Sequence, residues 1–214
     1  MKNPFKRHQE QDGLGSDLAP DEDVNDHSFQ SQPGSESRTM YVEYADYWNQ
    51  HTRINVLDRD KTTAIYTVDA RYRKPQMRIH SNTTNAEVAT VDFHSLTTRM
   101  DLRFRGQPLT LESSGFMATQ HWWASPELGG EKMTWKPRSK LDDLNIVLLD
   151  GQGMAIARYK PNYKSMKRGG SLEMLAPCWR SEALMEEVIV MLLAVVHYKE
   201  SQRMSATLTA TASA

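Results

Sequence analysis

The chain has little cysteine, which limits both its cross-linking and its metal chemistry. Its 214 residues include one cysteine, Cys178, so no disulfide can form within the chain and no cysteine-rich zinc site can be built. None of the seven histidines has a helical partner four residues away. We therefore expect no metal and no cofactor; only a histidine–carboxylate site assembled across strands would escape this argument.

Signatures of catalysis are also missing. The chain contains no G-x-S-x-G nucleophile elbow, no P-loop and no G-x-G-x-x-G dinucleotide motif. Cys178, between Pro177 and Trp179, has no local signature of a reactive thiolate and is interpreted as a packed small hydrophobic residue. We therefore expect no catalytic residues and a non-enzymatic protein, with an enzyme lacking any recognisable motif as an alternative.

No hydrophobic run is long enough to cross a bilayer. The longest, residues 188–196, would span about 14 Å as a helix, against roughly 30 Å of bilayer hydrocarbon. The basic residues at the N-terminus are not followed by the apolar stretch of a secretory signal. We expect no transmembrane segment and an intracellular, cytoplasmic protein, peripheral at membranes if it binds lipid.

Charge and polarity divide the chain into three parts. Residues 1–39 are polar with isolated apolar residues, and residues 205–214 are small and polar, so both are predicted to be disordered tails of a domain at residues 40–204. Residues 1–40 carry four basic and eight acidic residues, a net charge of −4, and the remaining 22 basic and 19 acidic residues give +3. Because +3 is a weak electrostatic footprint, a nucleic-acid partner is not expected.

Alternating apolar and polar residues indicate many short strands. Apolar Met100, Leu102 and Phe104 alternate with charged residues, as in a half-buried strand. The same pattern occurs at residues 54–56, 66–68, 77–79, 89–93 and 109–111, and apolar runs beside turns predict further strands at 146–149, 154–159 and 172–175. Turn residues separate these runs, most clearly at Asp150-Gly-Gln-Gly153. About ten to twelve antiparallel strands in succession predict a barrel or a sandwich.

The last part of the domain has a different pattern, which predicts a helix at about residues 182–203. Ser181 can cap its start, and His197, Lys199 and Arg203 suit its last turns. Residues 188–196 are apolar on every face, so this helix must be buried on all sides. A closed β-barrel supplies a hollow of that kind.

A family resemblance rests on four features: Trp135 opening a strand, the segment LNIVLLDGQGMAIARY at residues 144–159, the segment GSLEML at residues 170–175, and the helix from residue 183 to 203. In these the chain resembles the tubby C-terminal-like superfamily, which includes tubby domains, plant LURP-one-related proteins and phospholipid scramblases, and it is most similar to uncharacterised fungal members over about residues 50–204. The resemblance implies a mostly β fold: a closed antiparallel barrel of about twelve strands around a central hydrophobic C-terminal helix. The proline-rich and cysteine-rich stretches of the scramblases are absent, which disfavours scramblase activity.

Two basic stretches are the candidate binding residues. Arg71, Arg73 and Lys74 follow a predicted strand, and Lys160, Lys164, Lys167 and Arg168 are interleaved with tyrosines. Basic residues beside aromatic ones suit anionic headgroups, so we expect anionic phospholipid or phosphoinositide at a membrane surface, or a protein partner. Solvated loops with no ligand are one alternative. A carrier of small apolar ligands, similar to lipocalins, is another.

Overall fold

The computed structural model describes residues 36–46, 51–94, 97–114, 119–139, 141–164 and 168–212. Residues 1–35 of the predicted N-terminal tail therefore lie outside the described residues, as do residues 213–214.

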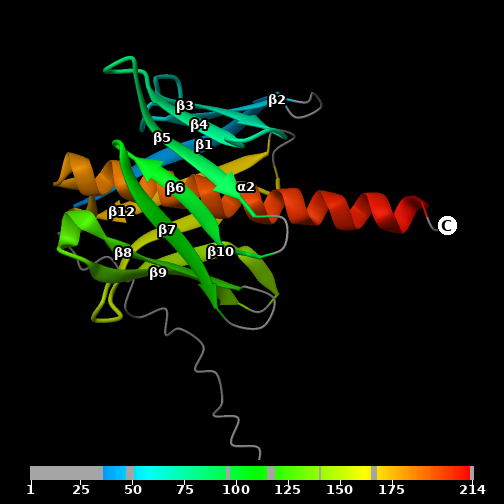
Figure 1. Cartoon of the computed structure of the whole chain (residues 1–214). Helices are drawn as coiled ribbons and strands as arrows, with labels where there is room; N and C mark the ends of the chain where they lie inside the picture. The colour runs from blue at the N-terminus through cyan, green and yellow to red at the C-terminus, as the bar shows by residue number, and fades with distance from the viewer. Residues whose placement is uncertain are drawn as a thin grey trace, which may run out of the picture.

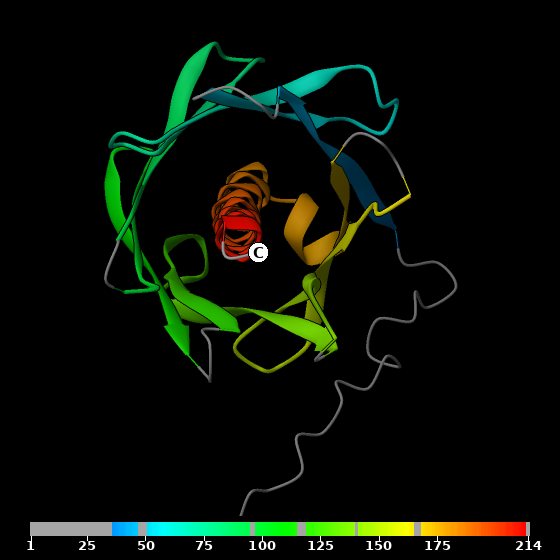
Figure 2. The same cartoon turned by 90° about the vertical axis from the view of Figure 1, so that its right-hand side faces the viewer.

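Twelve antiparallel strands form the wall of a closed barrel (Figures 1 and 2). They are β1 (Ser37–Asp46), β2 (His51–Leu57), β3 (Ala64–Arg71), β4 (Met77–Ser81), β5 (Ala86–Phe93), β6 (Met100–Phe104), β7 (Gln107–Ser114), β8 (Gln120–Ser125), β9 (Glu131–Ser139), β10 (Asp142–Leu149), β11 (Ala155–Pro161) and β12 (Gly169–Leu175). Each strand pairs with the next along the chain, and β1 pairs with β12 to close the ring. A 3₁₀ helix, η3 (Pro126–Leu128), connects β8 to β9.

The strands form where the sequence alternates, because one side of each strand faces an apolar interior. In β6, Met100, Leu102 and Phe104 are buried whereas Asp101 and Arg103 are not. The predicted turn at residues 150–153 connects β10 to β11, with Gly153 at a φ of 79°. The predicted closed barrel is confirmed.

A helix fills the barrel, as predicted. The short helix α1 (Ala176–Trp179) follows β12, and α2 (Glu182–Ala212) then runs along the barrel axis (Figure 2). Residues 188–196 of α2 are at most 3% exposed. A barrel of eight strands is just filled by its own side chains, and the diameter grows with strand number, so twelve strands leave room for a helix.

The structure corrects three predicted boundaries. β1 begins at Ser37, three residues before the predicted start of the domain, because it pairs with β12 from its first residue. Trp135 lies in the middle of β9 and does not open it. α2 continues through Ala212 and so includes most of the predicted C-terminal tail, beyond the end of the barrel (Figure 1).

Polar contacts fix α2 inside the barrel near its N-terminus. The fully buried Glu187 accepts hydrogen bonds from the indole of Trp123 and from Ser125 Oγ at 3.0 Å, both on β8. Arg105, in the β6–β7 turn, donates to Glu186 at 2.7 Å. Because buried polar groups are costly without partners, these bonds favour one rotation and one depth of the helix.

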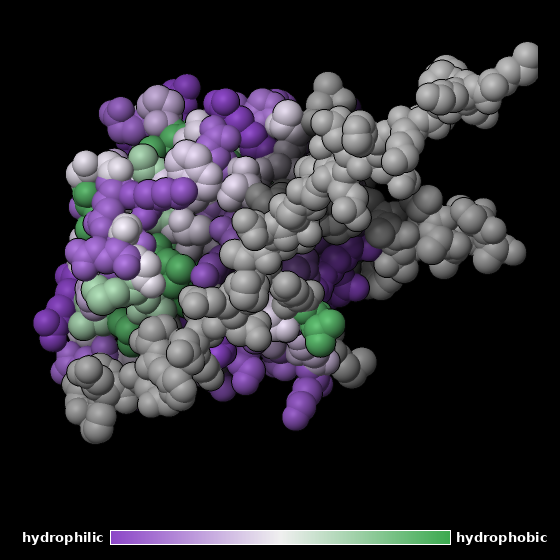
Figure 3. Space-filling model, turned by 90° about the horizontal axis from the view of Figure 1, so that it is seen from below, coloured by the Kyte–Doolittle hydropathy of each residue, from purple (hydrophilic) through white to green (hydrophobic). Residues whose placement is uncertain are grey.

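The outer wall is largely hydrophilic. Viewed from below, hydrophobic residues form small groups between hydrophilic ones (Figure 3). Among the residues described, no helix combines the length and apolarity that crossing a membrane requires.

Candidate ligand-binding surface

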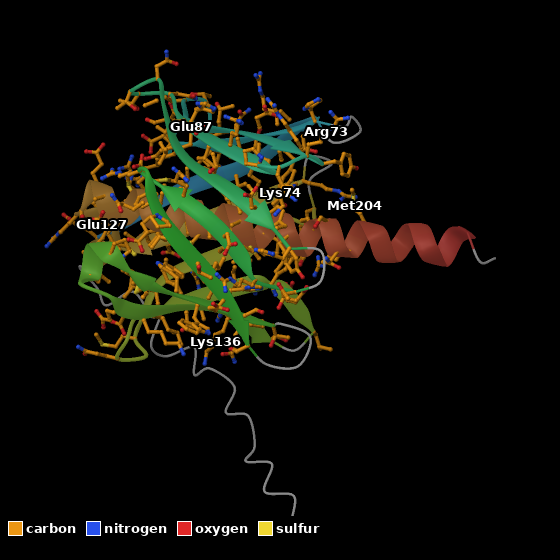
Figure 4. The ribbon with its side chains drawn as sticks, viewed as in Figure 1. Arg73, Lys74, Glu87, Glu127, Lys136 and Met204 are labelled. Carbon is orange, nitrogen blue, oxygen red and sulfur yellow. The ribbon has the colours of Figure 1, made fainter. Side chains whose placement is uncertain are left out.

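The topology brings the two basic stretches to the same end of the barrel. Strands alternate in direction, so the β1–β2, β3–β4, β9–β10 and β11–β12 hairpins all turn at the end where the C-terminus of α2 emerges. Around the barrel wall, the β1–β2 hairpin lies between the β11–β12 and β3–β4 hairpins. Arg73 and Met204 lie toward this end in Figure 4, and Glu127 lies at the opposite end.

In the β3–β4 turn, the basic residues differ in their surroundings. Arg71, the last residue of β3, donates hydrogen bonds to Asp69, whose carboxylate is also 3.8 Å from His51 Nδ1. Arg73 and Lys74 are exposed and have no ion pair within the described part of the chain. In this turn, Arg73 and Lys74 are therefore the basic residues whose charge a ligand can reach.

The basic residues of the second stretch are likewise divided. Lys160 is exposed but lies on β11, not in the loop where it was predicted. Lys164 is exposed in the β11–β12 turn, where its backbone N–H donates to the side chain of Asn162 at 3.2 Å. Arg168 Nη1 lies 3.6 Å from Glu200 of α2, and Lys167 lies outside the described residues.

Exposed apolar side chains gather at the same end. Four large hydrophobic residues are exposed in the described chain, and three of them are in these hairpins: Tyr72 (79% exposed), Leu141 (98%) and Tyr163 (63%). The fourth, Met154, follows the β10–β11 turn at the opposite end. We define the basic rim as Tyr72, Arg73, Lys74, Leu141, Tyr163 and Lys164.

Ion pairs connect the rim to the central helix. The hydroxyl of Tyr163 donates to Asp142, and the adjacent Asp143 accepts from Arg203 of α2. Lys199 Nζ lies 3.9 Å from Asp143 as well. Burial lowers the pKa of the Lys199 ammonium, and the nearby Asp143 opposes that shift. These contacts hold the β9–β10 and β11–β12 hairpins against the end of the helix.

A groove of about 240 Å³ lies on the outer wall beside the rim. It follows β12, where Gly169 and Ser171 form a floor of small residues. Lys160 of β11 stands on one side, and Tyr41 and Glu43 of β1 stand on the other. Arg168 also lines the groove, so two of the predicted basic residues meet here.

The barrel interior near the rim contains two titratable rings. His121 is fully buried, and neither of its ring nitrogens has a hydrogen-bond partner among the described residues. Burial lowers its pKa to about 3, with a further contribution from the charge of Lys199, and burial lowers the pKa of His197 to about 4. His121 is fully buried beside Tyr198, whereas His197 is half-buried beside Phe93, and neither ring lines the groove. No group of three or more His, Cys, Asp or Glu side chains in the described chain is placed to hold a metal ion.

Sequence reasoning missed several residues of this surface. Tyr41 and Glu43 join the groove through the β1–β12 pairing, which no local pattern encodes. Leu141 gave no signal because it is one apolar residue in a polar turn.

Two comparisons with known proteins bear on the chain. A family model described as "Family of unknown function (DUF6593)" matches residues 49–201, which cover β2 to β12 and most of α2. No curated protein matches the chain. The family match does not link the chain to the tubby C-terminal-like superfamily, so that resemblance stays a prediction.

Proposed function

The chain belongs to the DUF6593 family of unknown function, and we propose that it is a non-enzymatic binding module that attaches to anionic phospholipid membranes through the basic rim. The observation that carries the proposal is the coincidence, at one end of the barrel, of exposed basic residues with most of the exposed large hydrophobic residues.

The rim has the chemistry that a membrane interface selects. Tyrosine suits the headgroup level because its ring is apolar and its hydroxyl is polar, and Tyr72 and Tyr163 are both exposed. Leu141 can enter the acyl boundary. Arg73, Lys74 and Lys164 can meet anionic headgroups, each contributing about 1 kcal/mol near the surface.

The orientation follows from the position of the helix. The C-terminal part of α2 emerges at the rim end, where Arg73 and Met204 lie (Figure 4). Ion pairs of Asp143 with Arg203 and of Glu200 with Arg168 hold this part of the helix against the hairpins. The hairpins that carry the basic rim are therefore fixed in place by their contacts with α2. The opposite end carries both signs of charge, with Glu127 and Asp150 beside Arg59 and Lys61.

Co-flotation of the full chain with vesicles tests the proposal. We expect binding to vesicles that contain phosphatidylserine or phosphoinositide, weakening as salt is added, and no binding to neutral vesicles. Replacing Arg73, Lys74 and Lys164 together by glutamine should weaken binding by about a hundredfold, from about 1 kcal/mol for each charge. Replacing Tyr72 and Leu141 by serine should weaken binding through the loss of apolar contacts, and this loss should be similar at low and high salt.

A matched control comes from the opposite end of the barrel. The double variant Arg59→Gln, Met154→Ser removes one exposed basic and one exposed apolar residue there and should float like the unchanged protein. Equal loss in the rim variants and in this control would contradict the assignment to the rim. Absence of binding to every vesicle would contradict the membrane proposal and favour a protein partner.

A carrier function is less well supported than a binding module. Residues 188–196 of α2 occupy the space in which a barrel of lipocalin type would hold its ligand. The groove beside β12 lies on the outer wall and not in the barrel interior.

A further inference from the structure

The sequence before β1 carries its charges in two blocks. The three basic residues of residues 1–35 lie within the first seven positions. Residues 10–26, which we call the acidic segment, contain seven acidic residues and no lysine, arginine or histidine, a net charge of −7. Leu14, Leu18 and Val24 are spaced among these acidic residues. The acidic segment thus combines a high density of negative charge with a few apolar side chains.

The structure fixes the point at which this sequence joins the barrel. The backbone oxygen of Glu36 accepts a hydrogen bond from the indole of Trp179, on α1, at 3.1 Å, and its carboxylate lies 3.7 Å from Arg180. From there β1 runs to its hairpin with β2, which turns at the rim end. Residues 1–35 are therefore attached at the end of the barrel opposite the basic rim.

The chain before β1 is long enough for the acidic segment to reach the rim. β1 has ten residues, so at about 3.3 Å per residue the path along the wall is at most about 33 Å. The eleven residues from Asp26 to the start of β1 can span up to about 36–40 Å. The other six acidic residues are farther from β1 in sequence, so they can reach the rim with chain to spare.

The basic rim has the complementary chemistry. Its basic residues, Arg73, Lys74 and Lys164, are exposed and have no acidic partner in the part of the chain that the structure describes. The three hydrophobic residues of the rim are 63–98% exposed. Unpaired positive charge beside exposed apolar side chains suits a segment that carries negative charge and isolated apolar residues.

The opposite end of the barrel is nearer to the point of attachment but complements the segment less well. Arg59 and Lys61 are exposed there, but Glu127 and Asp150 lie at the same end and would repel the segment. Met154 is the one large hydrophobic residue exposed at that end among the residues described. Charge and apolar exposure together therefore favour the rim.

We propose that the acidic segment docks on the basic rim of its own chain. Each exposed pair of charges contributes little alone, but the covalent connection keeps the segment at a high effective concentration near the rim. Where the rim attaches to a membrane, the docked segment competes with anionic lipid. This competition rests on the proposed function, whereas the docking itself does not.

Zero-length carbodiimide cross-linking of the full chain, read by mass spectrometry, tests the docking without a membrane, because it joins a lysine amine to a carboxylate in contact with it. We expect cross-links from Lys74 and Lys164 to residues 10–26, with a yield that falls by about threefold or more at about 1 M salt. Lys61 and Lys132 are the control lysines, because both are exposed at the opposite end. Cross-links confined to these controls, an equal yield at all four lysines, or no cross-link to the segment would each overturn the docking.

A mixture of isotopically light and heavy chains identifies the chain that supplies the segment. Cross-links that join residues of the same isotope only support docking within one chain. Rim cross-links that always include light and heavy pairs at the statistical frequency would overturn it and assign the segment to a second copy of the chain.

Flotation then tests the competition. A full-chain variant in which the seven acidic residues are replaced by their amides should bind phosphatidylserine vesicles about tenfold more tightly, since three exposed charge pairs no longer oppose binding. The matched control exchanges aspartate and glutamate within the segment, keeps the charge, and should bind like the unchanged protein. Equal flotation of all three proteins would overturn the competition.

The two experiments fail separately. Rim cross-links without flotation of any of the three proteins would overturn the membrane proposal and leave the docking intact. Tighter flotation of the amide variant without rim cross-links would overturn the docking, because it would show that the membrane simply repels the acidic segment.

Discussion

Mild acid should destabilise this protein through the two histidines enclosed at the rim end of the barrel. His121 is fully buried beside Tyr198, with a ring-centroid distance of 6.1 Å, and the ring of His197 lies 5.9 Å from that of Phe93. Neither nitrogen of His121, nor Nδ1 of His197, has a hydrogen-bond partner in the described chain. Protonating either ring would put an uncompensated charge in an apolar region, close to the ammonium of Lys199 in the case of His121.

The magnitude follows from the difference between folded and unfolded pKa values. The ordinary pKa is 6.5, and burial lowers it to about 3 for His121 and about 4 for His197. The unfolded chain therefore binds more protons than the folded one below the ordinary pKa, and stability falls as the pH falls. Between about pH 7 and about pH 5, each ring should lower the free energy of unfolding by about 2 kcal/mol, or about 4 kcal/mol together.

One group has the opposite effect. Burial raises the pKa of Glu187, so its protonation favours the folded state as the pH falls. The comparison must therefore be made between proteins that share this carboxyl group. The double variant His121→Phe, His197→Phe removes both titrating rings and keeps ring contacts with Tyr198 and Phe93.

Urea unfolding of the two proteins at both pH values measures the difference. The unchanged protein should lose about 4 kcal/mol more than the double variant on acidification, and each single variant should remove about half of that difference. Parallel losses in all four proteins would refute the reasoning, because they would show that the rings are protonated as readily in the folded state as in the unfolded one.

Three further substitutions probe the packing. Leu192→Asp places an unpaired charge in the filled barrel, so it should cost several kcal/mol of stability and give insoluble protein. The control Leu141→Asp changes an exposed position and should stay folded. A soluble, monomeric, folded L192D protein would contradict the central place of the helix. Glu187→Leu leaves the buried indole N–H of Trp123 without its acceptor and should lower the free energy of unfolding by about 2 kcal/mol. Glu187→Gln keeps an acceptor and should cost less. Equal losses of the two variants in urea unfolding would mean that the hydrogen bond contributes little. Gly169→Ala should lower the melting temperature because its Cβ meets the backbone of β1, and an unchanged melting temperature would mean that the two strands separate easily.

Much of the fold could be predicted because its signals are local. The alternation in strands such as β6 and the uniform apolarity of residues 188–196 depend on neighbours in the sequence alone. Closure of the ring depends on the pairing of β1 with β12, across the whole length of the domain, and it was expected indirectly, from the need of the apolar helix for a hollow and from a family resemblance. The hydrogen bond from the indole of Trp123 to Glu187 could not be predicted from the sequence, because it depends on both the register of β8 in the sheet and the position of α2 along the barrel axis.

The candidate site was predicted in part for the same reason. Clusters of basic residues are visible in the sequence, and their meeting at one end follows once alternating hairpins are counted correctly. Which of them keep their charge available is a matter of neighbours: Asp69 engages Arg71, and Glu200 engages Arg168. Glu43 lines the groove from a strand that begins inside a predicted tail.

The place of α2 after all twelve strands in the chain determines when the barrel can be filled. The closing strand β12 and the helix are synthesised after the other strands, so a growing chain holds up to eleven strands with no partner for β1 and nothing to fill the interior. Such an intermediate exposes apolar strand faces and two open edges, which are prone to aggregate. A chain that ends before β12 stays in that condition permanently, whereas an extension after Ala212 does not enter the barrel. We therefore expect the chain to tolerate fusion after Ala212 and not truncation into β12 or into residues 188–196 of α2.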